Sequence, residues 1–97
     1  MLLERAELEI RPGAEEAFFQ LMLERGLPLL KAVPGVKWAK LGRGVESPGK
    51  FMFLVEWESL DAHKAFNQSE VSPEFRSLFT PYSLTGKMEH FQMHETD

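Results

Sequence analysis

Residues 2–11 (LLERAELEIR) alternate between apolar and charged side chains, and this pattern limits the possible folds more than any other in the chain. One face carries Leu2, Ala6, Leu8 and Ile10, and the other carries Arg5, Glu7, Glu9 and Arg11. Alternation over this length predicts a β-strand that packs one face against apolar partners. Pro12-Gly13 then ends the strand.

Two further strands and a divided helix follow. Residues 14–32 repeat apolar residues at helical spacing, and Gly26 and Pro28 should kink or divide that helix. Residues 36–45 and 50–58 read as strands, joined by turn-forming residues at 46–49. Because residues 51–55 are apolar on both faces, we expect the second of these strands to be central in its sheet.

The last third of the chain predicts two short helices and a final strand. Ser59 is placed to cap a helix over 59–67, and Pro73 suits the first position of a helix over 73–80. Residues 85–93 form the last predicted strand. The order β-α-β-β-α-β predicts an α+β, ferredoxin-like fold: a four-stranded antiparallel sheet with helices on one face, built as a single domain over residues 1–97.

Composition narrows the classes of partner. A net charge of −4 argues against nucleic acid, and no apolar run is long enough to cross a membrane. The absence of cysteine excludes disulfides and thiolate ligands. His90 and His94 would lie about 13 Å apart along a strand, so we expect no metal site there. The face of the sheet without helices mixes charged and apolar residues, which favours a homodimer, and we expect a cytoplasmic protein.

Four stretches resemble a known family: RPGAEEAF, VPGVKWAKLGRGVESPGKFMFLVEWESLDAHKAF, SPEF and MEHF. They are similar to the antibiotic biosynthesis monooxygenase (ABM) domains, and the resemblance runs from about residue 3 to residue 93. It implies a dimeric α+β barrel. The family includes cofactor-independent monooxygenases of aromatic compounds, quinol monooxygenases and heme-degrading enzymes. The heme-degrading members share an Asn, a Trp and a His whose positions fall here at Ala6, Phe66 and Arg76, so the resemblance does not imply heme.

The resemblance implies a monooxygenase that uses no cofactor and acts on a small aromatic or quinol-like compound. Such chemistry needs an apolar pocket and a group that removes a proton from the substrate. The candidate catalytic residues are His90, as proton acceptor, and Tyr82, as a hydrogen-bond donor. The candidate substrate-binding residues are Trp57, His63, Phe66 and Phe79.

Four of these candidates also have a structural interpretation. Trp57 could simply pack under the helix that follows it, and His63 could lie on the surface. His90 could be a core histidine bonded to a neighbour, and Tyr82 could anchor the turn before the last strand. The alternative function is a non-catalytic dimeric module that binds a small hydrophobic molecule, and a third possibility is a purely structural dimer.

Overall fold

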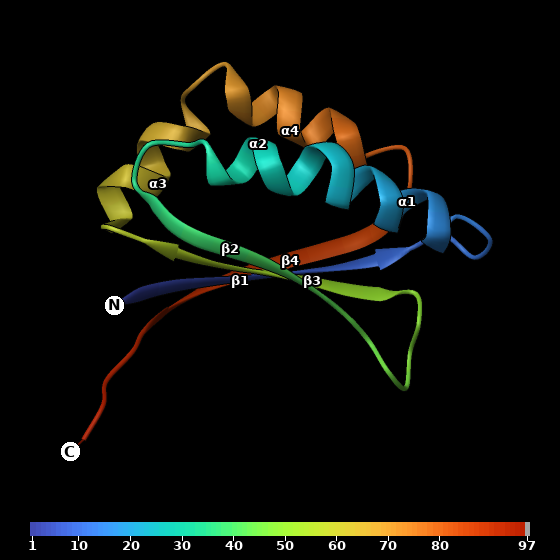
Figure 1. Ribbon diagram of the computed structural model, residues 1–97, viewed down its shortest axis with the longest axis horizontal. Coiled ribbons are helices and arrows are strands. Elements are labelled where there is room, and N and C mark those ends of the chain that lie inside the picture. The colour runs from blue at the N-terminus through green and yellow to red at the C-terminus, as the bar shows by residue number, and fades with distance from the viewer. Residues whose placement is uncertain (97) are drawn as a thin grey trace.

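A four-stranded antiparallel sheet, in the order β2-β3-β1-β4, carries all the helices on one face in the computed structural model, which describes residues 1–96 (Figure 1). The elements are β1 (Leu2–Ile10), α1 (Glu15–Leu21), the π-helical segment η1 (Met22–Gly26), α2 (Leu27–Lys31), β2 (Val36–Arg43), β3 (Lys50–Trp57), α3 (Leu60–Asn67), α4 (Val71–Phe79) and β4 (Ser83–Gln92). The predicted ferredoxin-like α+β fold is confirmed.

The strand register decides which side chains share the helix-covered face. β3 pairs with both β1 and β2, so its predicted central position is confirmed. Glu4 of β1 lies between Val55 of β3 and His90 of β4, and Ala6 lies between Phe53 and Met88. These rows therefore lie on one face, under the helices. The buried core spans Leu8, Ile10, Phe18, Met22, Phe51, Phe53, Val55 and Trp57 of these elements, among others.

The first helix divides where the sequence predicted a break. Pro28 has no backbone N–H to donate to the preceding turn, and the chain passes through the π-helical turn of η1 just before it. Gly26 ends that turn at a crowded point, because a Cβ there would lie 2.7 Å from Sδ of Met22. The π-helical turn before Pro28, and the close approach of Gly26 to the Met22 side chain, together account for the division of the first helix into α1 and α2.

The start of α3 is confirmed and that of α4 is corrected. The backbone N–H of Ala62 donates to Oγ of Ser59 at 3.1 Å, so Ser59 caps α3 as predicted. Helix α4 begins at Val71, two residues before the predicted start, which places Pro73 third in the helix. Proline is tolerated there because the N–H groups of a first helical turn have no partner within the helix.

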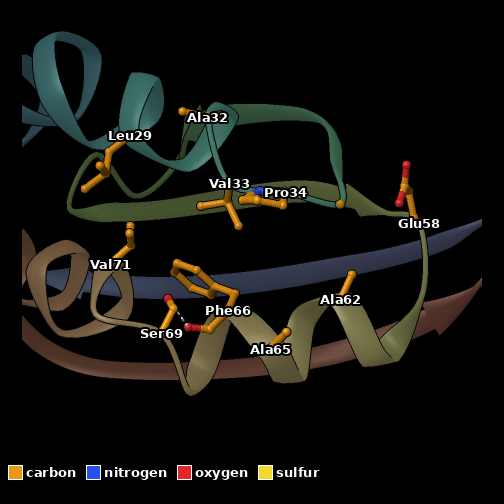
Figure 2. A pocket seen from close by; sticks show the side chains of 11 residues that line it. Leu29, Ala32, Val33, Pro34, Glu58, Ala62, Ala65, Phe66, Ser69 and Val71 are labelled. Carbon is orange, nitrogen blue, oxygen red and sulfur yellow. Dashed lines mark hydrogen bonds between the residues drawn. The ribbon is translucent and has the colours of Figure 1, made fainter.

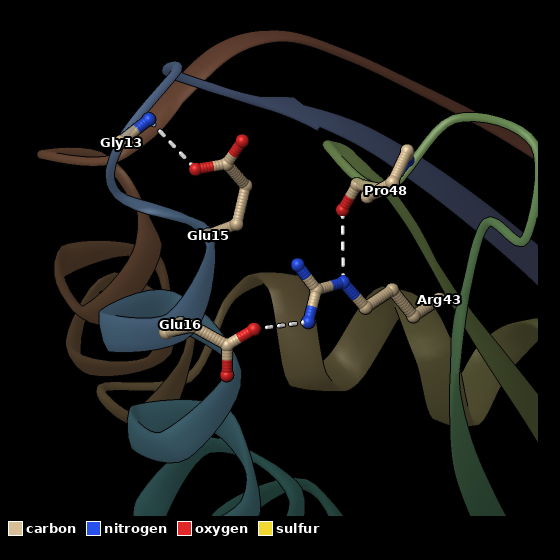
Figure 3. Close-up of polar contacts among 5 residues, drawn as sticks. All are labelled: Gly13, Glu15, Glu16, Arg43 and Pro48. Atoms are coloured by element: carbon tan, nitrogen blue, oxygen red, sulfur yellow. Dashed lines mark hydrogen bonds and ion pairs between the residues drawn. The ribbon is translucent and has the colours of Figure 1, made fainter.

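Arg43 ties the β2–β3 loop to the start of α1 (Figure 3). Its Nη1 donates to Oε1 of Glu16 at 2.6 Å, and its Nε donates to the carbonyl oxygen of Pro48 at 2.9 Å. In the turn before α1, the backbone N–H of Gly13 donates to Oε1 of Glu15 at 2.7 Å. These contacts fix one end of the helical layer against the sheet.

The sheet face without helices carries both charged and apolar side chains, as the sequence predicted. Arg5 pairs with Glu89, and Lys87 pairs with Glu7, each at 3.3 Å. The guanidinium of Arg5 also lies 5.4 Å from the ring centroid of Phe91. Among the residues described, no helix is both long and apolar enough to span a membrane.

Candidate active site

A cavity of about 550 Å³ lies between the helix-covered face of the sheet and the pair α3 and α4. Phenylalanines form much of its wall: Phe53 from β3, Phe66 from α3, and Phe75 and Phe79 from α4. Their rings contact one another edge-on, with Phe53 and Phe75 centroids 5.7 Å apart and Phe75 and Phe79 centroids 5.5 Å apart. The volume is in the range of about 300–1,000 Å³ that is usual for small-molecule sites.

A buried carboxylate lies in the wall of this cavity. Glu4 stands on the helix-covered face of β1 and is only 8% exposed. Nε1 of the fully buried Trp57 donates to its Oε1 at 2.8 Å. A buried charge needs such a partner, because desolvation without one costs several kcal/mol. Trp57 uses Oε1, which leaves Oε2 of Glu4 for a group inside the cavity.

A buried histidine lies next to this carboxylate. His63 of α3 is 3% exposed, and its ring stacks on Trp57 with centroids 4.7 Å apart. Its Nε2 lies 3.6 Å from Oε1 of Glu4. Burial lowers the pKa of His63 below 6.5; Glu4 opposes that shift and His90 adds to it. His63 is therefore neutral at pH 7 and can accept a proton.

His90 extends this arrangement to the edge of the sheet. It lies on β4, next to Glu4 in the register, and is half-buried. Its Nε2 lies 2.5 Å from Nδ1 of His63, where either nitrogen can donate depending on the tautomers. Glu4, His63 and His90 thus lie in a row, with an ion-pair-range contact of 3.6 Å between the first two and a hydrogen-bond contact between the histidines, and we call this row the acid–histidine chain. It leads from the cavity wall to a half-buried edge.

The same three residues have the donor types of a metal site. One nitrogen or oxygen from each lies within 4.8 Å of the others. Two nitrogens bound to one tetrahedral zinc ion at about 2.1 Å each would be about 3.4 Å apart. Nδ1 of His63 and Nε2 of His90 are closer than that, at 2.5 Å. As arranged, the two histidine nitrogens suit a hydrogen bond between the rings better than two ligands of one ion.

The structure separates the predicted site residues into three groups. His63, Phe66 and Phe79 line the cavity. Trp57 and His90 lie behind its wall, where Trp57 contacts Glu4 and His90 contacts His63. Tyr82 is not among the lining residues: its ring packs on that of Phe18, with centroids 6.3 Å apart.

Two features differ from what the sequence suggested. The surface position considered for His63 is wrong, because the residue is almost fully buried. Glu4 was not identified, although the strand's own alternation places it on the face of Leu2 and Ala6. A carboxylate on an otherwise apolar face was the available signal.

A second groove lies between the end of α2 and helix α3 (Figure 2). It measures about 380 Å³ and is mostly apolar, with Leu29, Val33 and Ala62 among its lining residues. Phe66 lines both this groove and the larger cavity. The acid–histidine chain contributes no residue to the groove, so the larger cavity is the better candidate for chemistry.

Residues 1–79 match the family described as "Antibiotic biosynthesis monooxygenase". The chain belongs to that family. It is 31% identical to YczJ, an uncharacterised protein of Bacillus subtilis, over 95% of this chain and 98% of YczJ.

Solved structures of the family share the fold. A protein of Bordetella bronchiseptica assigned to the antibiotic biosynthesis monooxygenases is 27% identical, with a TM-score of 0.87 and 97% of each chain covered. SnoaB of Streptomyces nogalater, described as a cofactor-independent oxygenase and solved as a point mutant, is 16% identical. Its TM-score is 0.83, over 98% of this chain and 94% of that one. At this identity, the likeness to SnoaB concerns the fold alone.

Proposed function

We propose that this protein is a cofactor-independent monooxygenase of a small aromatic or quinol-like compound. One observation carries the proposal: the acid–histidine chain meets a phenylalanine-walled cavity at Glu4 and His63. An apolar wall holds an aromatic ring, and a buried base beside it can remove the proton of a ring hydroxyl. SnoaB, which shares this fold, is described as a cofactor-independent oxygenase, and this description supports the same type of reaction in the proposal.

In such a reaction the substrate itself supplies the electrons. A phenol with a free carbon opposite its hydroxyl reacts with one O2 to give one quinone and one water. One oxygen atom enters the ring and the other leaves as water, and the phenol loses four electrons. Removing the hydroxyl proton comes first, because the phenolate gives up an electron to O2 more readily than the phenol does.

The acid–histidine chain supplies a path for that proton. Oε2 of Glu4 accepts it from the substrate hydroxyl. The carboxyl group must then turn its protonated oxygen toward Nε2 of His63, which lies 3.6 Å from Oε1, before the ring can receive the proton. Nδ1 of His63 and Nε2 of His90 are in contact, so the charge can move on toward the sheet edge. His90 keeps a role in proton transfer, although it stands behind His63 and does not line the cavity.

Oxygen uptake with a panel of phenols and hydroquinones tests the proposal, with a protein-free blank for autoxidation. Glu4→Gln keeps an oxygen that accepts from Trp57 but removes the base, and we expect kcat to fall about 100-fold or more. His63→Gln should cause a comparable fall. Glu9→Gln, an exposed carboxylate on the same strand, and His94→Gln are the matched controls and should leave kcat unchanged.

Two further variants test the catalytic residues predicted from the sequence. His90→Ala should slow the reaction less than His63→Gln does, because it removes only the far end of the chain. Tyr82→Phe removes the hydroxyl and nothing else. An unchanged kcat in Tyr82→Phe would end the catalytic assignment of Tyr82, and an unchanged kcat in both Glu4→Gln and His63→Gln would overturn the proposed mechanism.

The alternative is a non-catalytic module that binds a small hydrophobic molecule. The second, mostly apolar groove of about 380 Å³ favours it, because a binding protein needs such a surface and no base. Equilibrium binding without oxygen uptake across the panel would support this alternative. A ligand displaced by Ala62→Leu, which fills the groove, would locate the binding there.

The proposal includes a homodimer formed through the sheet face without helices. That face carries two ion pairs, Arg5 with Glu89 and Lys87 with Glu7. The apolar ring of Phe91 lies beside Arg5 on the same face. Light scattering after size-exclusion chromatography should give twice the chain mass of 11.1 kDa. Phe91→Lys should shift the protein toward the monomer, and a monomeric wild-type protein at micromolar concentration would contradict the assembly.

A further inference from the structure

The cavity wall also contains a cation fixed by a buried hydroxyl. Arg76 and Ser72 lie one turn apart on α4, and both line the cavity. Nη2 of Arg76 donates to Oγ of Ser72 at 2.8 Å. Ser72 is 1% exposed, so its hydroxyl is a fixed anchor, whereas Arg76 is exposed overall. The bond holds one edge of the guanidinium at the cavity and leaves its other N–H groups available.

Arg76 differs from Lys87, the other basic residue that borders the cavity. The side chain of Lys87 lies on the sheet face without helices, where its ammonium is 3.3 Å from Oε2 of Glu7 and is compensated by that carboxylate. The ion pairs recorded within residues 1–96 do not include Arg76. A guanidinium that has a hydroxyl partner but no carboxylate partner retains its charge for a ligand. Its planar fork matches a carboxylate with two parallel hydrogen bonds.

We infer that Arg76, held by Ser72, binds a carboxylate group of the substrate, so that the substrate is a hydroxylated aromatic acid. This inference rests on the proposed function, because the same ring must place its hydroxyl at Glu4. The charges orient such a molecule: the Glu4 carboxylate repels the acid group, and Arg76 attracts it. The phenylalanine walls hold the ring between these two groups.

The cavity is large enough for a substituted ring. Gly86 of β4 lines it opposite Leu8, and a Cβ at this position would lie 2.9 Å from Cδ2 of Leu8. The absence of a side chain at Gly86 therefore lets Leu8 pack against β4 at this part of the wall. A cavity of about 550 Å³ accommodates one or two aromatic rings with their substituents.

The test compares two hydroquinones that differ only in charge: 2,5-dihydroxybenzoate and its methyl ester. Dissociation constants are measured without oxygen, by tryptophan fluorescence, and KM and kcat are measured by oxygen uptake. The acid should bind about tenfold or more tightly than the ester, which is the effect of a charge-assisted hydrogen bond. Higher salt should weaken binding of the acid more than binding of the ester.

Variants of Arg76 test whether this residue causes the preference for the acid over the ester. In Arg76→Gln the ester-to-acid ratio of KM should fall toward one, with a much smaller change in kcat for the acid. Arg76→Lys should restore part of the ratio, because it returns the charge without the fork. Ser72→Ala should reduce the ratio by freeing the guanidinium. Arg25→Gln, an exposed arginine of η1 outside the cavity, is the matched control and should keep the wild-type ratio.

The outcomes separate this inference from the proposed function. Equal affinity of wild-type protein for acid and ester, or no binding of either, overturns the carboxylate site. If the ester-to-acid ratio of KM is unchanged in Arg76→Gln, another residue causes the preference for the acid, and the carboxylate site at Arg76 is again overturned. Tight binding of the acid that depends on Arg76, without oxygen uptake, supports the carboxylate site and contradicts the monooxygenase. If Arg76→Gln fails to fold by circular dichroism, Arg76→Lys and the wild-type ratio decide.

Discussion

Replacing Trp57 by phenylalanine should destabilise the protein far more than the same change at Trp38. Trp57→Phe removes the hydrogen bond to Oε1 of Glu4, formed at 2.8 Å between buried groups. Losing a hydrogen bond to a charged group costs about 1.5–3 kcal/mol. The smaller ring also leaves a gap beside His63, which should add about 1 kcal/mol. We therefore expect the free energy of unfolding to fall by about 2.5–4 kcal/mol.

This change is large for a small domain, whose total stability is about 5–15 kcal/mol. The melting temperature should fall by roughly 10–30 °C, from about 4–8 °C per kcal/mol at this chain length. Urea unfolding followed by circular dichroism measures the free energy, and a thermal scan measures the melting temperature. Trp38 is half-buried and lies 5.1 Å from Nζ of Lys40, so Trp38→Phe should cost at most about 1 kcal/mol.

A double-mutant cycle isolates the bond between Trp57 and Glu4. Glu4→Met removes the acceptor, so Trp57→Phe should cost at least about 1 kcal/mol less in that background than in the wild type. Two results would refute the reasoning. One is a cost of Trp57→Phe within about 0.5 kcal/mol of that of Trp38→Phe. The other is additivity of Trp57→Phe and Glu4→Met within the same margin.

Three other predictions follow from the site and the fold. Burial lowers the pKa of His63, so protonation of its ring should quench the emission of the stacked Trp57 with a midpoint below pH 6.5, measured in Trp38→Phe protein to remove the other tryptophan. Below pH 6.5 the unfolded protein binds more protons than the folded protein, so the free energy of unfolding should also fall as the pH falls. A midpoint above pH 6.5 would contradict this prediction. Gly35→Ala should lower the free energy of unfolding in urea by about 1–3 kcal/mol more than Gly13→Ala does. Both glycines have φ near +90°, but of the two only Gly35 has a neighbour, Ala62, that a Cβ would meet. Equal losses of stability would contradict this packing. Treatment with EDTA should leave oxygen uptake unchanged, whereas loss of uptake that Zn²⁺ restores would mean that His63 and His90 bind an ion.

The fold was predictable because its signals are local. The alternation of residues 2–11 defines β1, and the turn residues at 46–49 separate β2 from β3. Ser59 caps α3 within three residues of its partner, Ala62. The start of α4 was missed by two residues because Pro73 is compatible with any position in a first helical turn. Local chemistry therefore predicts which elements form better than where they begin.

The site was only partly predictable because it joins distant segments. His63 lies three residues before Phe66 on α3, and that spacing could have placed it on the apolar side of the helix. The contact of His63 with His90 and Glu4 depends on the register of β1 against β4, at opposite ends of the chain. No local pattern specifies that register. The sequence could therefore identify two histidines, but not the buried carboxylate that lies beside them.

The stretch VEWESLDAHKAF, residues 55–66, explains how a carboxylate can remain buried in an apolar layer. Trp57 ends β3 and donates to Glu4 from the sheet, and the Ser59 cap starts α3 so that His63 covers the same carboxylate from above. Phe66, one turn further, closes the cavity wall. Stability and the proposed chemistry thus depend on one carboxylate. Variants that improve packing around Glu4 at the expense of its polar contacts should be more stable and less active.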